Sequence, residues 1–136
     1  MSVAQTPLTP DEWVEQFAQA WRNHDADLVA SLFVENGRLY ISVLDRPVTG
    51  PEAIRAMWEQ GTANQSDCDV IFGKALSAGN RSVVEWWANV KNSGQPTTEP
   101  GCAVLHFNDA GLCVEMREYS ALRSEQIPLR EGWLAF

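Results

Sequence analysis

The stretch Arg81–Asn92, RSVVEWWANVKN, shows more clearly than any other part of the chain which side of a strand is buried. Side chains along a β-strand point alternately to its two faces. One face is wholly apolar and the other is mixed: Val84, Trp86, Ala88 and Val90 stand on the first, and Val83, Glu85, Trp87, Asn89 and Lys91 stand on the second. The alternation predicts a strand whose even-numbered side faces the protein interior.

Three more runs extend this strand into a meander. Turn signals at 78–80, 92–94 and 109–111 separate expected strands at 69–77, 82–92, 97–108 and 112–122. The apolar side carries Ala103, Leu105 and Phe107 on the third run, and Leu112, Val114 and Met116 on the fourth. By the same period of two, Glu118 and Ser120 are expected on the inward side of the last strand.

The first half of the chain carries helix signals instead. Helices are expected over residues 10–23, 25–36 and 51–61, with a strand over 38–44. Thr9 and Glu12 form a capping box around Pro10, which starts the first helix. The second is expected to begin at Asp25 or Asp27. Helices at the front and strands at the back predict the α+β class, with three helices packed on one face of a strongly curved antiparallel or mixed sheet.

Size and charge limit the classes of function. A chain of 136 residues is expected to fold as one domain, 1–136, with short flexible tails at 1–8 and 123–136. Its net charge of -8 repels phosphate backbones and anionic lipid surfaces, so neither nucleic acid nor membrane is an expected partner. The N-terminal residues lack the basic and apolar regions of a signal peptide, and a cytoplasmic location is expected.

The three cysteines do not predict a disulfide framework or a metal site. Cys68, Cys102 and Cys113 are odd in number and lack the spacing of zinc ligands. Each lies in an apolar run, and no histidine is placed by the sequence to activate it. They are interpreted as small buried hydrophobes, and neither metal nor cofactor is expected.

Four stretches resemble the NTF2-like superfamily and, within it, the SnoaL-like domains. They are FAQAWRNHDADLVASLFVENGRLY (17–40), VTGPEAIRAMWEQG (48–61), VVEWWANVKNSGQP (83–96) and VLHFNDAGLCVEMREYS (104–120). The resemblance covers nearly the whole chain from residue 12 to residue 120. It implies a cone of curved sheet closed by helices, a deep internal pocket and a homodimer.

The resemblance also implies which catalytic sets are missing. Ketosteroid isomerases of the superfamily have a tyrosine, a base and an acid where this chain has Phe17, Ile41 and Ala103. Limonene-type epoxide hydrolases have an arginine and an aspartate where this chain has Trp86 and Ala88. Neither mechanism is therefore expected in its family form.

SnoaL-type cyclases place an aspartate at the position of Glu118 and pair it with a histidine on a neighbouring strand. Glu118 keeps the acid with one more methylene group, but the histidine is not evident. His106 has outward parity in its strand, and His24 lies in a loop. The resemblance thus leaves Glu118 as the one candidate catalytic residue.

A carboxyl group in an apolar cavity loses hydration, which raises its pKa and suits it to general acid or base chemistry near neutral pH. The expected substrate-binding walls are Phe17, Trp21, Ile41, Met57, Trp58, Trp86, Ala88, Leu105, Met116 and Ser120. The structural alternative is that Glu118 lies at the mouth of the cone, paired with Arg38 or Arg55, and does no chemistry.

The leading hypothesis is a cofactor-independent isomerase, cyclase or dehydratase that acts on a small hydrophobic carbonyl compound. The alternative is a domain without chemistry, either binding a hydrophobic ligand or serving dimeric association. A third possibility is a pocket filled by Trp86 and Met116. The outer sheet side, with Trp87, Val104 and Tyr119 among charged residues, is the expected homodimer face.

Overall fold

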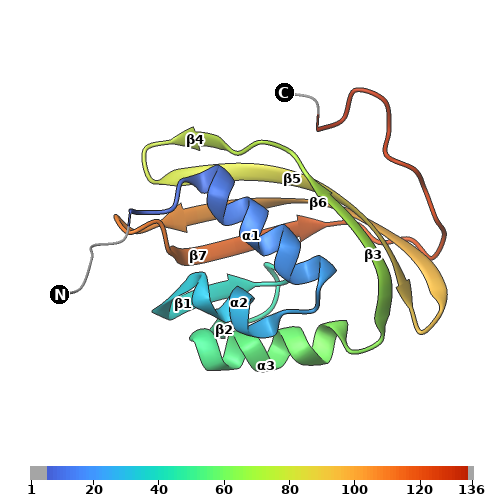
Figure 1. The fold of residues 1–136 in the computed structure, drawn as a ribbon, viewed down its shortest axis with the longest axis horizontal. Helices are drawn as coiled ribbons and strands as arrows, with labels where there is room; N and C mark the ends of the chain where they lie inside the picture. The colour runs from blue at the N-terminus through green and yellow to red at the C-terminus, as the bar shows by residue number, and fades with distance from the viewer. Residues whose placement is uncertain (1–5, 135–136) are drawn as a thin grey trace.

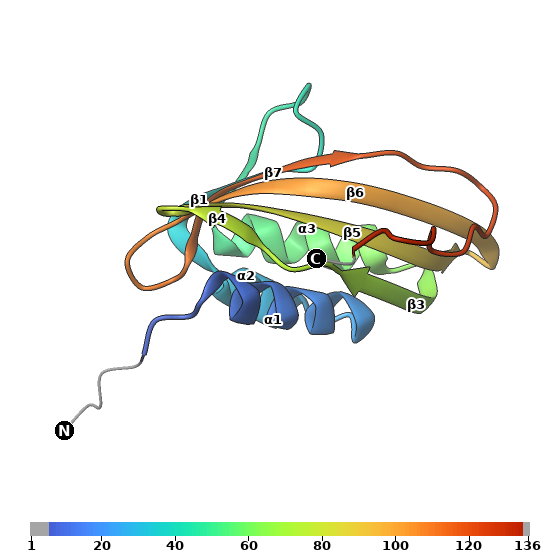
Figure 2. The same cartoon turned by 90° about the horizontal axis from the view of Figure 1, so that it is seen from above.

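A computed structural model of the chain describes residues 6–134. These residues form three helices and seven strands: α1 (Pro10–Arg22), α2 (Ala26–Ser31), β1 (Phe33–Tyr40), β2 (Val48–Thr49), α3 (Pro51–Thr62), β3 (Gln65–Phe72), β4 (Leu76–Ala78), β5 (Arg81–Asn92), β6 (Gln95–Phe107) and β7 (Cys113–Ser120). The helices lie on one face of a curved sheet, as Figures 1 and 2 show. Within residues 6–134, no helix has the length and hydropathy needed to cross a bilayer.

The sheet is mixed, in agreement with the sequence-based fold class. Its strand order is β2-β1-β7-β6-β5-β3, and β4 pairs with β5. β1 runs parallel to β7, whereas the other pairs are antiparallel. The long β5 and β6 bend over the helices, and the even-numbered side of β5 is buried from Ser82 to Val90 as predicted.

Helix α1 forms as its sequence predicts. The Thr9 hydroxyl accepts the Glu12 N–H, and the Glu12 carboxylate accepts the Thr9 N–H, so the capping box is complete. Inward, Trp13 stacks on Phe17 with ring centroids 5.3 Å apart, and its indole N–H donates to the Leu32 carbonyl. The first half of the aromatic stripe is therefore packed core.

The second helix is shorter than expected. It spans Ala26–Ser31, and the chain enters β1 at Phe33, where an extension of the helix to residue 36 was expected. The expectation is wrong because Phe33 pairs with Cys113 of β7, so tertiary pairing overrides local helix signals.

Gly37 is buried inside β1, where a Cβ would lie 3.0 Å from the Val34 carbonyl oxygen.

Strand β7 contains an irregularity that the period-two analysis did not anticipate. Its pairing with β6 shifts between His106 opposite Glu115 and Phe107 opposite Cys113. Such a bulge reverses the alternation of the preceding residues. Cys113 is therefore fully buried, and the inward assignment of Leu112 and Val114 is wrong. Beyond the bulge the predicted parity holds.

The segment after β7 packs on the outer face of the sheet. The Trp87 indole N–H donates to the Ile127 carbonyl at 2.9 Å, and the Trp87 ring meets Trp133 edge-on. Thr98 and Arg123 exchange backbone hydrogen bonds at 2.9 and 3.1 Å. This part of the expected flexible tail is thus held against the sheet.

The covering segment changes the outer face that was expected to carry a homodimer. Trp87 is only 5% exposed, so its assignment as an exposed anchor is wrong, because its own chain covers it. Val104 is half-buried and Tyr119 is exposed. A homodimer stays a prediction that these two residues carry. Residues 1–5 and 135–136 of the expected tails lie outside the described part of the chain.

Candidate functional site

A cavity of about 130 Å³ lies between the helices and the sheet, at the C-terminal ends of α1 and α3. Its walls are mainly apolar and include two acids: the lining residues are Trp21, Ile41, Met57, Trp58, Gly61, Thr62, Gln65, Glu99 and Glu118. An apolar cavity of about 150 Å³ holds one benzene molecule, so this space suits a ligand of about one small ring. The combination of apolar walls with a few polar groups is typical of ligand sites.

Glu118 projects into this cavity from β7, opposite Ala103 of β6, whose side chain is fully buried. Although Glu118 as a whole is only partly buried, protein atoms crowd its carboxyl group. Burial, together with the charge of Glu99, raises the pKa of Glu118 to about 8. The group is therefore largely protonated at neutral pH.

Glu99 is the second acid of the cavity, and the sequence analysis did not single it out. It lies on β6, opposite Ala88 of β5. Burial raises the pKa of Glu99 too, against a smaller opposite effect of the Trp86 indole. Glu99 has the same odd parity as Ala103 and Leu105, which were placed inward, so strand alternation alone already pointed to it.

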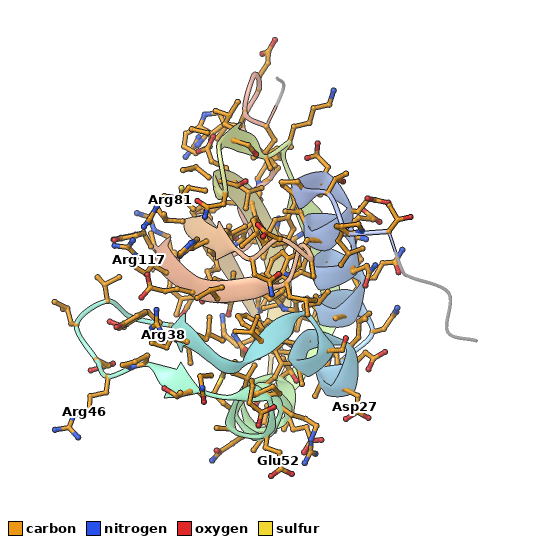
Figure 3. All side chains as sticks on the ribbon, turned by 90° about the vertical axis from the view of Figure 1, so that its left-hand side faces the viewer. Asp27, Arg38, Arg46, Glu52, Arg81 and Arg117 are labelled. Atoms are coloured by element: carbon orange, nitrogen blue, oxygen red, sulfur yellow. The ribbon has the colours of Figure 1, made fainter. Side chains whose placement is uncertain are left out.

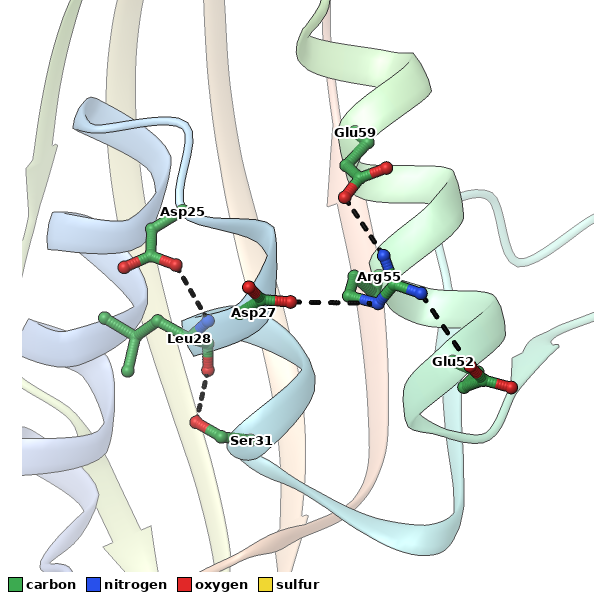
Figure 4. A network of polar contacts seen from close by, with 7 residues as sticks. All are labelled: Asp25, Asp27, Leu28, Ser31, Glu52, Arg55 and Glu59. Carbon is green, nitrogen blue, oxygen red and sulfur yellow. Dashed lines mark hydrogen bonds and ion pairs between the residues drawn. The ribbon is translucent and has the colours of Figure 1, made fainter.

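The two arginines considered as partners of Glu118 are engaged elsewhere. Arg38 lies on the outer side of the sheet with Arg81 and Arg117 (Figure 3), and its nearest carboxylate is Glu115 at 3.3 Å. Arg55 lies on α3 among three acids (Figure 4): Asp27 at 3.7 Å, Glu52 at 3.7 Å and Glu59 at 3.1 Å. Among the described residues, no ion pair involves Glu99 or Glu118.

Two indole N–H groups beside the acids lack hydrogen-bond partners. Trp58, which lines the cavity, is 8% exposed, and Trp86 is 2% exposed; neither Nε1 has a regular partner in the described part of the chain. The Trp86 indole interacts with Glu99, whose pKa it lowers, and Trp86 does not line the cavity. A buried donor without a partner costs free energy, so the Trp58 N–H is available to a ligand oxygen. Trp21 differs, because its N–H donates to the Gln65 side chain at 3.0 Å.

The Trp86 ring can lie against β6 because the residue opposite it on that strand has no side chain. It pairs with Gly101, and a Cβ on that glycine would lie 2.1 Å from Cζ2 of the indole. Gly101 therefore lets the ring lie across the strand between the positions of Glu99 and Ala103. The glycine is a packing requirement of the site.

The predicted wall residues divide between the cavity and the core. Trp21, Ile41, Met57 and Trp58 line the cavity with Glu118. The others do not line it: Phe17, Trp86, Ala88, Leu105 and Met116 belong to the buried core, and Ser120 is exposed at the end of β7. Trp86 and Met116 thus fill the middle of the cone, and the free space lies at one end.

The cysteines lie outside this cavity. Sγ of Cys68 is 3.5 Å from Nε2 of His24, a proximity that the sequence analysis did not foresee. Burial and the charge of Asp67 raise the pKa of Cys68, so the contact does not create a reactive thiolate. Burial raises the pKa of Cys113 to about 12. Across residues 6–134, no three His, Cys, Asp or Glu side chains gather as a metal site.

Solved structures share this fold. A hypothetical protein with a ketosteroid isomerase-like fold from Catenulispora acidiphila, in complex with trimethylamine, has a TM-score of 0.72 at 23% identity over 82% of this chain and 86% of that one. The epoxide hydrolase/cyclase-like enzyme SalBIII, involved in pyran ring formation in salinomycin, has a TM-score of 0.71 at 17% identity over 81% and 88%. A putative SnoaL-like polyketide cyclase from Shewanella denitrificans has a TM-score of 0.70 at 14% identity over 81% and 88%.

At these identities the neighbours establish the fold and not the reaction. A search of curated proteins found no significant sequence match. The family model of the SnoaL-like domain, however, matches residues 14–116, which is most of the 136-residue chain. The match begins within α1, includes all of β6 with Glu99, and ends within β7 at residue 116, two residues before Glu118. The chain therefore belongs to the SnoaL-like domain family.

Proposed function

We propose that this protein is a cofactor-independent enzyme of the isomerase, cyclase or dehydratase type, which moves a proton on a small hydrophobic carbonyl compound. The observation that carries the proposal is Glu118, an acid in a mainly apolar cavity that has no cationic partner among residues 6–134. A carboxyl group that is protonated at neutral pH can donate its proton to a carbonyl or leaving hydroxyl oxygen.

The cavity supports this chemistry in two further ways. The unpartnered N–H of Trp58 offers a hydrogen bond to an oxygen that gains negative charge during the reaction. The volume of about 130 Å³ favours a compact substrate of about one ring over a polycyclic one. Ile41 and Met57 supply the apolar contacts for its hydrocarbon part.

Proton exchange in deuterated water tests the proposal without knowledge of the natural substrate. The protein is incubated with a panel of small cyclic and branched ketones, and loss of the proton next to the carbonyl is followed by NMR. We expect catalysed exchange for at least one ketone, and a decrease of about 10²–10⁴-fold in Glu118→Gln, because general acid–base catalysis contributes about that much.

The matched control is Glu131→Gln, the same change at an exposed glutamate of the C-terminal segment. This variant should exchange at the wild-type rate. Equal rates in wild type and Glu118→Gln, for a ketone whose exchange the protein does catalyse, would remove Glu118 from the chemistry. Absence of catalysed exchange across the panel would favour a domain that only binds.

A second candidate, binding of a small organic cation without chemistry, is favoured by the walls of the same cavity. Trp21 and Trp58 meet at 83° with centroids 5.9 Å apart, and two carboxyl groups share the space. Aromatic faces and carboxylates together attract ammonium groups. The Catenulispora protein of the same fold holds trimethylamine.

Two ligands of equal shape separate this candidate from the first. Choline carries a quaternary ammonium group, and 3,3-dimethylbutan-1-ol is its neutral counterpart. A saturable rise in melting temperature with choline alone would support a cation site. Equal effects of both compounds, or none, would count against it.

A further inference from the structure

The cavity brings together two acids from neighbouring strands. Glu99 of β6 and Glu118 of β7 both line it, although the two residues are nineteen positions apart by number. Antiparallel pairing sets Ala103 opposite Glu118, and Glu99 has the same strand parity as Ala103, so both acids lie on the inward side of the sheet. The other lining residues carry no titratable side chain: they are Trp21, Ile41, Met57, Trp58, Gly61, Thr62 and Gln65.

A separate observation indicates that the space receives a polar ligand group. Trp58 is more than nine-tenths buried, lines the cavity and has an indole N–H without a partner in the described part of the chain. Since buried donors are normally paired, an oxygen atom of a ligand is the natural acceptor for this N–H.

We propose that Glu99 and Glu118 act as a pair that shares one proton, with Glu99 as the base and Glu118 as the acid of the reaction. The sharing of the proton is a property of the cavity alone, whereas the catalytic roles rest on the proposed function. The inference adds a second catalytic residue, at a position where the sequence comparison with the family had suggested none.

The electrostatic reason is that no cationic side chain of residues 6–134 lines the cavity. Two carboxylates in a poorly hydrated space repel each other, so one of them retains its proton where two isolated carboxyl groups would both be ionised. The charged groups on surrounding elements are turned away: Glu115, Arg117 and Arg38 lie on the outer side of the sheet, and Arg55 lies among acids on α3. The pKa of Glu118, which burial and then the charge of Glu99 raise, agrees with this arrangement.

The pair can interconvert a ketone and its enol with a balanced exchange of protons, and delivery of the proton to a different carbon of a conjugated enol isomerises the substrate. Ionised Glu99 removes the proton next to the carbonyl, and the electrons of that C–H bond form a carbon–carbon double bond. The carbonyl π electrons move to oxygen, which takes the proton of Glu118, so an enol forms and the two acids exchange protonation states. The enol then returns its proton to Glu118 as Glu99 delivers its own proton to carbon. The site carries one proton and one negative charge throughout.

Titration of the two side chains by NMR tests the shared proton directly. With ¹³C-labelled glutamate, the carboxyl signals of residues 99 and 118 are assigned from the variants and followed against pH. In Glu99→Gln, the midpoint of Glu118 should move to lower pH by more than about 0.5 unit, because a neighbouring negative charge has been removed. In Glu118→Gln, the midpoint of Glu99 should stay in place, because Glu118 is still protonated and neutral at the pH where Glu99 ionises.

If Glu99→Gln does not fold, the wild-type protein carries the test, because the Glu118 signal of a coupled pair should show a second inflection at the midpoint of Glu99. An unchanged Glu118 midpoint in folded Glu99→Gln would overturn the pair. Glu131→Gln serves as the control and should leave both midpoints in place. In the conservative Glu99→Asp variant, the midpoint of Glu118 should fall by less than in Glu99→Gln, because a carboxylate remains nearby. A purely structural role of Glu99 does not predict this difference.

Exchange kinetics then separate this inference from the proposed function. For a ketone that the protein turns over, Glu99→Gln should lower the exchange rate at least 100-fold, and the double variant should be no slower than the slower single variant, because the two residues act as a unit. Coupled titration without any exchange would keep the pair and reject the enzyme. Exchange that depends on Glu118 but survives in Glu99→Gln would keep the enzyme and reject the pair.

Discussion

The two sides of the β6–β7 pair give a glutamate opposite electrostatic surroundings. On the outer side, Glu115 lies 3.3 Å from Arg38 and 3.5 Å from Arg117, and both arginines remain partly exposed. On the inner side, Glu118 meets apolar walls, an unpartnered indole and a second acid. Three positions along one strand thus separate an ion-paired carboxylate from a carboxyl group whose pKa is raised to about 8. The difference comes from the partners that each face of the sheet supplies.

The largest expected effect probes how tightly the inner side is packed. In Gly101→Ala, the new Cβ meets Trp86 at 2.1 Å, and the buried ring has no free direction. We expect a loss of about 3 kcal/mol in the free energy of unfolding, measured in urea, since overpacking of a well-filled core costs about that much. Gly61→Ala on α3 is the control. Its nearest neighbour is Sδ of Met57 at 4.0 Å, so it should gain up to about 1 kcal/mol. Equal effects of the two changes would mean that the inner side is loosely packed.

The next effect is the pH dependence of the free energy of unfolding that Glu118 causes. The pKa of Glu118 is about 8 in the folded protein and near 4.5 ordinarily, so between these values the folded state binds more protons than the unfolded chain. The contribution of Glu118 to stability is therefore complete below about pH 4.5 and lost as the pH rises through 8. Relative to wild type, Glu118→Gln should gain roughly 2–3 kcal/mol between about pH 6 and pH 9.

Glu115→Gln supplies the matched comparison for this pH effect. Its stability relative to wild type should stay level across the same range, because the residue is ion-paired on the outer side. Parallel stability curves for wild type and Glu118→Gln would contradict the inner environment described here. Urea unfolding at each pH gives both curves.

The smallest expected effect is the loss of free energy of unfolding when the outer ion pairs are removed. Glu115→Gln should cost about 0.5–1 kcal/mol at low salt and less at high salt, since partly exposed pairs are weak and screened. Unfolding in low and high salt measures the difference. A cost above about 3 kcal/mol would show that the outer acid is a buried charge, and the contrast between the two sides would disappear.

The parts that the sequence predicts well are those that local rules determine. The capping box of Thr9 and Glu12 fixes the start of α1, and the alternation around Trp86 fixes the buried side of β5. The inward direction of Glu118 also follows from alternation, because it lies beyond the bulge. Glu99 obeys the same rule but was overlooked among the residues preceding Ala103.

The remaining features depend on contacts between distant segments. The early end of α2 is decided by the pairing of Phe33 with β7, and the bulge near Cys113 by the register of β6. No local sequence pattern predicts that the segment around Ile127 covers Trp87. The reduction of a deep pocket to a small cavity likewise arises from how Trp86 packs over Gly101, which only the assembled sheet determines.

Infrared spectroscopy determines whether Glu118 is protonated at neutral pH. The difference spectrum of wild type minus Glu118→Gln at about pH 7 should contain the C=O stretch of a protonated carboxylic acid, which disappears as the pH is raised through about 8. A difference spectrum with only ionised carboxylate bands at about pH 7 would contradict the account.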